Sequence, residues 1–78
     1  MDNVVLLNPS KWVTEDVLMM ITGMRSGTIK SARKKSWAAG REYLHISPDG
    51  SPKENSECMY NHEAIINWIE KQRNSQPQ

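Results

Sequence analysis

The sequence predicts a small α+β domain with about three helices, a β-hairpin and a short N-terminal strand. Two observations lead to this prediction. Apolar residues recur at helical spacing in segments that begin with good capping residues, and two strand-like runs flank a long polar loop. The chain has 78 residues, which is the size of one domain. We expect the domain to cover residues 1–73, and we expect residues 74–78 to form a disordered polar tail.

The N-terminal strand is predicted at Val4–Leu7, an apolar run that Asn8 and Pro9 end. The first helix follows. Thr14 is its expected N-cap, and Gly23 is its expected C-terminal stop. Its expected buried stripe consists of Val17, Met20, Ile21 and Met24, widened by Leu18.

The second helix is predicted to start with Ser26 as its N-cap and to stop at Gly40. On a helical wheel, one small and fairly apolar face contains Ile29, Ala32 and Ser36. Arg33 lies at the border of this face, and lysines with short polar residues occupy the other side. We expect Trp37 to anchor the helix end in the core; stacking of its indole on a nucleic acid base is the alternative.

A hairpin and a closing helix are predicted after residue 42. Strand-like runs at 43–46 and 58–60 surround a polar loop at 47–57, which contains the turn signal Pro48-Asp49-Gly50. Asn61 is the expected N-cap of the last helix. Its expected buried stripe is Ile65, Ile66 and Ile69, with Trp68 half buried. Two short helices joined by a glycine-containing turn and followed by a hairpin indicate a winged helix-turn-helix.

Residues 25–41 concentrate positive charge. This stretch holds six of the ten Lys and Arg residues and none of the nine Asp and Glu residues, although the whole chain has a formal net charge of +1. A helix of about ten residues is roughly 15 Å long, and the major groove of B-DNA, about 12 Å wide, accommodates such a rod. A basic second helix is therefore expected to bind DNA. A solvated lysine face is the alternative.

The candidate DNA contacts fall into groups by chemistry. The residues expected to neutralise phosphates are Lys30, Lys34 and Lys35. The residues expected to reach base edges are Thr28, Ser31 and Arg33. Arg25 and Arg41 flank the helix and are candidates for clamping the two backbones. Lys53 is a candidate for a backbone contact from the hairpin loop, and a loop that makes no contact is the alternative.

Catalytic and metal chemistry is not expected. His45, Cys58 and His62 offer three metal ligands at best, without the paired CxxC spacing that is typical of a zinc site. A nucleophile–base pair of Cys58 and His62 has no orienting third group and no oxyanion site. We therefore expect no enzyme activity, no cofactor and no metal. We also expect no signal peptide and no membrane span, because no apolar run approaches the roughly 20 residues that cross a bilayer.

Several motifs resemble a known family. The most specific are Gly-Thr-Ile-Lys at 27–30 and Gly-Arg-Glu-Tyr at 40–43. The other matching pieces are residues 12–18, Thr22-Gly23, residues 31–33, Ser36-Trp37, His45, residues 48–50, residues 55–58 and Tyr60-Asn61. With these residues, the chain resembles the small excisionases of enterobacterial phages and prophages over residues 4–70. A looser resemblance, to the helix-turn-helix of MerR-type regulators, covers residues 13–37.

The excisionase resemblance implies a non-catalytic winged-helix protein that acts as a recombination directionality factor. Such a protein binds DNA in the attachment region, often beside neighbouring copies of itself, and bends it. It also contacts the phage's tyrosine integrase, so that excision is favoured over integration. The setting implied is the bacterial cytoplasm, in association with the nucleoid. This chain differs from the lambda-type pattern in its longer loop at 47–57 and its full closing helix, so the resemblance alone does not assign wing contacts or an integrase-binding tail to residues of this chain.

Two other functions are compatible with the sequence. A prophage-encoded transcriptional regulator uses the same DNA-binding surface, and a recombination assay separates it from an excisionase. A protein-interaction module whose basic helix binds an acidic partner is the second. It predicts no DNA affinity at moderate salt and no loss of function when Ser31 or Arg33 is changed.

Overall fold

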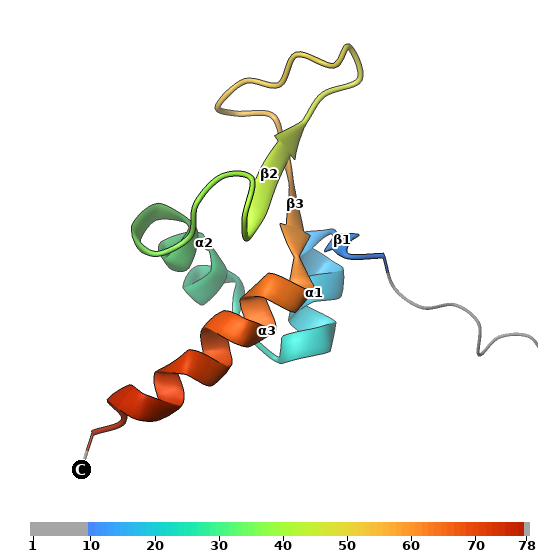
Figure 1. Cartoon of the computed structure of the whole chain (residues 1–78). Helices are drawn as coiled ribbons and strands as arrows, with labels where there is room; N and C mark the ends of the chain where they lie inside the picture. The colour runs from blue at the N-terminus through green and yellow to red at the C-terminus, as the bar shows by residue number, and fades with distance from the viewer. Residues whose placement is uncertain (1–9, 78) are drawn as a thin grey trace, which may run out of the picture.

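The computed structural model describes residues 10–77, so the strand predicted at Val4–Leu7 lies outside the described residues. The chain alternates short helices with a small sheet (Figure 1). In order, the elements are β1 (Trp12–Val13), α1 (Glu15–Thr22), α2 (Ser26–Lys35), β2 (Tyr43–Ile46), β3 (Glu57–Asn61), α3 (His62–Lys71) and a short 3-10 helix, η2 (Gln72–Ser75). The predicted α+β fold is confirmed: a helix-turn-helix is followed by a β-hairpin and a closing helix.

Helix α1 has the predicted ends but a different buried face. The Thr14 side chain accepts a hydrogen bond from the Val17 N–H, and Gly23 ends the helix with a left-handed φ of 77°. Leu18 is fully buried, whereas Met20 is 81% exposed. The prediction that Met20 and Ile21 belong to the buried stripe is therefore wrong. Met20 lies two residues from Leu18, about 200° around the helix, so it points away from the core.

Helix α2 begins and ends earlier than predicted. Arg25 occupies the N-cap without a side-chain hydrogen bond, and Ser26 is the first helical residue. The helix ends at Lys35 because the N–H groups of Ser36 and Trp37 both donate to the Ala32 carbonyl, which turns the chain toward the core. Gly40 (φ 92°) lies in the connection that follows and does not end the helix. Ile29 and Ala32 are buried as predicted, but Ser36 is exposed.

The antiparallel sheet has the order β1-β3-β2, so β3 is the central strand. Tyr60 of β3 lies opposite Val13 on one side and Tyr43 on the other. The predicted hairpin is confirmed. The pairing of β1 was not predicted, because a strand of two residues is too short to show an alternating pattern.

The core forms where the three helices meet the sheet. Its buried apolar residues are Val13, Leu18, Ile29, Ala32, Trp37, Tyr60 and Ile65. Trp37 is 6% exposed, which confirms its predicted anchoring role. Its indole makes edge contacts with Tyr60 (ring centroids 6.1 Å apart) and Trp68 (5.3 Å).

Helix α3 is capped by Asn61, whose side chain accepts from the Ala64 N–H. Ile65 is fully buried, but Ile66 is 40% exposed and Ile69 is similarly exposed, so the predicted stripe is wrong at these two positions. Ile66 directly follows the buried Ile65, so it lies about 100° around the helix from it. Figure 1 shows that α3 runs past the small sheet toward its C-terminal end, where Ile69 lies. The hairpin loop and the end of α3 project in opposite directions, and α2 lies on one side between them.

Candidate nucleic-acid interface

The outer face of α2 gathers most of the predicted DNA-binding residues. Thr28, Lys30, Ser31, Lys34 and Lys35 are all exposed on this helix, which contains no Asp or Glu. Within residues 10–77 the three lysines form no ion pair. Their positive charges are therefore free to attract phosphate groups.

The start of α2 is fixed against α1. The Ser26 hydroxyl donates a 2.6 Å hydrogen bond to Glu15 Oε2. Arg25, one residue earlier, is exposed. Because Ser26 and Ile29 hold the inner side of α2, the opposite side is presented to solvent in one orientation. Arg25 lies at the edge of that presented surface.

Arg33 is placed differently from the other candidates. Its Nη1 atom donates to Tyr60 Oη at 2.6 Å and lies 3.4 Å from Cys58 Sγ, so the guanidinium points toward β3. Burial raises the pKa of the Tyr60 hydroxyl, and the Arg33 charge opposes part of this rise. Burial lowers the pKa of Arg33, but attraction to Tyr60 and Cys58 outweighs it, so the pKa of Arg33 is raised. Arg33 therefore ties α2 to the central strand.

Arg41 is engaged with its neighbour Glu42. Its Nε atom lies 2.8 and 2.7 Å from the two carboxylate oxygens of Glu42, although most of the Arg41 side chain is exposed. The buried Glu42 carboxylate also accepts from the Ala38 N–H at 3.0 Å. Burial acts to raise the pKa of Glu42, but the hydrogen bonds from Ala38 and Arg41 outweigh it and lower that pKa. Part of the Arg41 charge is thus neutralised within the protein.

Glu42 holds Arg41 and the connection after α2 in place, a role that the sequence reasoning did not predict. Its main chain adds to its role, because its carbonyl accepts from the Asn61 N–H at 2.8 Å. It therefore braces the connection between α2 and β2 against the end of β3. The motif Gly-Arg-Glu-Tyr at 40–43 was the available signal, since an acidic residue directly beside a conspicuous arginine is a natural ion-pair partner.

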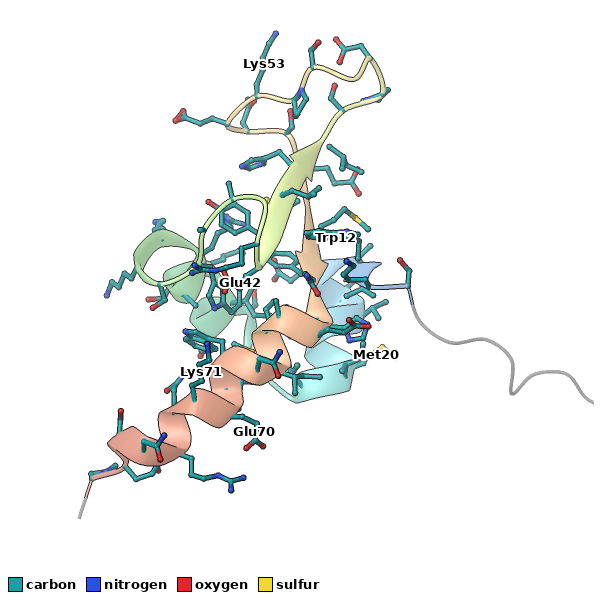
Figure 2. All side chains as sticks on the ribbon, viewed as in Figure 1. Trp12, Met20, Glu42, Lys53, Glu70 and Lys71 are labelled. Carbon is teal, nitrogen blue, oxygen red and sulfur yellow. The ribbon has the colours of Figure 1, made fainter. Side chains whose placement is uncertain are left out.

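The hairpin loop is built from two turns. In the first, the Gly50 N–H donates to the Ser47 carbonyl, and the Asp49 carboxylate accepts from Ser47 Oγ and the Ser51 N–H. In the second, Lys53 and Ser56 exchange hydrogen bonds. Figure 2 shows the Lys53 side chain pointing outward from the far end of this loop. Lys53 therefore lies on the projecting loop and not beside α2.

Most of the chain matches one protein family. Residues 4–73 match the family described as "Putative excisionase (DUF1233)". The chain belongs to this family. No match was found among curated proteins. The match includes both helices of the helix-turn-helix, the hairpin and α3, so every predicted DNA-binding residue of this excisionase-family chain lies inside it.

Membership of this family indicates a recombination-related DNA-binding role for the chain. The predicted contacts of individual residues with DNA remain predictions at this stage. No helix in the described part of the chain is long and apolar enough to cross a membrane.

The three candidate metal ligands do not come together. His45 Nδ1 lies 2.9 Å from the Ser56 carbonyl oxygen and 3.4 Å from Cys58 Sγ. Because a carbonyl oxygen accepts, this contact places the proton of a neutral His45 on Nδ1. His62 lies apart from this pair, with its Nε2 atom 2.9 Å from the Ser10 carbonyl oxygen. Within residues 10–77, no group of three potential ligands is positioned to hold a metal ion.

Proposed function

We propose that the chain is an excisionase that binds attachment-region DNA of a phage or prophage, with α2 in the major groove. The observation that carries this proposal is the outer face of α2. It combines three exposed lysines, none of which forms an ion pair within residues 10–77, with two exposed hydroxyl side chains on a helix without acidic residues. Such a face suits phosphates at its edges and base edges at its centre.

The proposed roles follow from where each side chain lies. Lys30, Lys34 and Lys35 bind phosphates, and Thr28 and Ser31 contact base edges. Arg25 and Lys53 add backbone contacts at the start of α2 and at the wing. Arg33 and Arg41 support this surface from behind through Tyr60 and Glu42. With about four to six phosphates neutralised, the logarithm of the affinity falls with the logarithm of salt concentration with a slope of roughly −4 to −5.

The recombination role requires more than one bound copy. A single module of this size makes few base contacts, so we propose that neighbouring copies and a tyrosine-type integrase add the rest. Bending a site of 20–30 base pairs costs about 1–6 kcal/mol, which these added contacts offset. The protein directs the integrase toward excision without catalysing a step itself. Residues 1–73 act as the DNA-binding unit, within the bacterial cytoplasm and nucleoid.

DNA binding is tested with a triple lysine variant and a control variant that removes one exposed lysine elsewhere. Lys30→Ala, Lys34→Ala and Lys35→Ala are combined, and Lys11→Ala serves as the control, because Lys11 is an exposed lysine next to β1. Affinity for an attachment-region duplex and a scrambled duplex is measured across a salt series. We expect the slope of log affinity against log salt concentration to be about 2.7 less negative for the triple variant than for wild type, because each phosphate contact contributes about 0.9. An unchanged slope would show that these lysines do not bind phosphates.

Direction of recombination is tested by an excision assay with the cognate integrase. We expect the wild-type protein to stimulate excision, to inhibit integration and to bend the attachment-region duplex. The triple lysine variant is expected to do none of these. Specific DNA binding without any effect on excision would contradict the excisionase role and would favour a transcriptional regulator.

A further inference from the structure

A hollow of about 560 Å³ lies between α2 and α3, next to the proposed DNA-reading face. One wall is the side of α2 that carries Thr28, Ser31 and Lys35, and the other is Trp68 of α3. Arg25 also lines it. Three of these residues thus belong both to the hollow and to the exposed face of α2. The hollow is therefore an extension of that face toward α3.

The chemistry of the hollow favours an anionic occupant with an apolar part. Two cations lie at opposite ends of α2, Arg25 at its N-cap and Lys35 at its last residue, and no acidic residue is among those that line the hollow. Ala32 and the Trp68 indole supply apolar surface between them. A nucleic acid strand has this combination, because charged phosphates alternate with deoxyribose rings that present C–H groups.

Trp68 is held in place for such a contact. It is half buried and packs at 81° to the Trp37 ring, with the ring centroids 5.3 Å apart. Trp37 is itself a buried core residue, so the position of Trp68 is fixed by the core. The buried indole nitrogen without a hydrogen-bond partner within residues 10–77 is that of Trp37. The Trp68 indole is partly exposed, so its N–H group can reach a phosphate oxygen.

We propose that the hollow receives a short stretch of one DNA strand, with a deoxyribose against the Trp68 indole and phosphates at Arg25 and Lys35. This inference rests on the proposed function and adds α3 to the DNA-binding surface. It gives the complex two flanks: the hairpin loop follows one backbone, and α3 follows the other. The arrangement of the elements is compatible with this, because α2 lies between the loop and the outer half of α3 (Figure 1).

The contact is tested by NMR on uniformly ¹⁵N-labelled protein, in which the tryptophan indoles and the backbone amides are observed together. Trp12, on the edge strand β1, is the internal control. On addition of the attachment-region duplex, we expect the Trp68 indole signal to move together with the amides of Thr28 and Ser31, while the Trp12 indole signal stays in place. Movement of the α2 amides without the Trp68 signal would overturn this inference alone. Absence of movement at both places would overturn the proposed function as well.

A variant gives a second readout. Trp68→Phe keeps an aromatic ring against Trp37 and removes the N–H group, and its thermal midpoint is checked first. Loss of one hydrogen bond predicts about three- to tenfold weaker duplex binding, whereas Trp12→Phe is expected to bind like wild type. Equal affinity of the folded Trp68→Phe protein and wild type would argue against the contact. A Trp68 signal that moves with a polyglutamate peptide but not with the duplex would assign the hollow to an acidic protein partner and overturn the proposal.

Discussion

Replacing Arg33 with methionine separates a supporting role of this residue from a base-reading role. Methionine keeps an unbranched apolar side chain and removes the guanidinium. In the structure, the guanidinium donates to the Tyr60 hydroxyl at 2.6 Å, and Tyr60 is 1% exposed. The substitution therefore removes a charged donor and leaves a buried hydroxyl without a partner.

The expected loss of stability follows from this geometry. A hydrogen bond to a charged group contributes about 1.5–3 kcal/mol, and partial exposure of Arg33 places its bond toward the lower end of this range. We expect Arg33→Met to lower the free energy of unfolding by about 2 kcal/mol. A chain of this length has a total of about 4–12 kcal/mol, so the variant stays folded. Tyr60→Phe leaves the partly exposed Arg33 to water and is expected to cost about 0.5–1 kcal/mol.

Urea unfolding and DNA binding together decide between the two roles. With an m-value of about 1 kcal/mol/M, the unfolding midpoint of Arg33→Met is expected to fall by about 2 M. The ratio of affinities for the attachment-region and scrambled duplexes is expected to stay near the wild-type ratio. A lost base contact typically costs about 1–3 kcal/mol of discrimination between the two duplexes. If Arg33→Met loses this discrimination while its stability is unchanged, the supporting role is wrong and Arg33 reads a base.

Two further predictions concern the connection after α2 and the turn before it. Glu42→Gln is expected to cost about 1–2 kcal/mol at pH 7, because Arg41 loses a charged acceptor. Folding lowers the pKa of Glu42 from 4.5, so the carboxylate stabilises the fold fully above pH 4.5, and this stabilisation is lost as the pH falls through the folded-state pKa. The free energies of unfolding of the variant and of wild type, measured by chemical unfolding, should therefore converge in acid. Gly23→Ala is expected to destabilise by about 1 kcal/mol, because Gly23 has a φ of 77° although nothing lies within 4 Å of an added Cβ. Gly27→Ala is the matched control, because Gly27 is helical and has equally open surroundings, and this variant should have a slightly higher thermal midpoint than wild type. A higher midpoint for Gly23→Ala than for Gly27→Ala would contradict the conformational argument.

The sequence predicted the elements better than it predicted which faces are buried. Local signals suffice for an N-cap such as Thr14, a stop such as Gly23 and a polar loop between two strands. The buried face of α1 was wrong because its eight residues are mostly apolar, so helical periodicity does not distinguish Leu18 from Met20. Packing against a distant element makes that choice, and the sequence pattern does not contain it.

The same limit applies to the candidate interface. The exposed lysines and hydroxyls of α2 followed from periodicity, because they lie opposite Ile29 and Ala32. The place of Arg33 did not, because its partner Tyr60 is 27 residues further along the chain. At the border of the wheel, a long side chain reaches either the solvent or the sheet. The position of Tyr60 determines which of the two Arg33 reaches, and that position is set when the sheet forms.

The central position of β3 has a consequence for how the protein is made. Residues 57–61 complete the sheet on both sides and supply Tyr60, against which Trp37 and Arg33 pack. A chain leaving the ribosome carries α2 long before it carries this strand. Until then, the basic helix has no sheet to hold it, and contacts between residues 12–13 and 60–61 must wait until β3 has been synthesised. The basic helix of the nascent protein is therefore held in place only after β3 has emerged and paired.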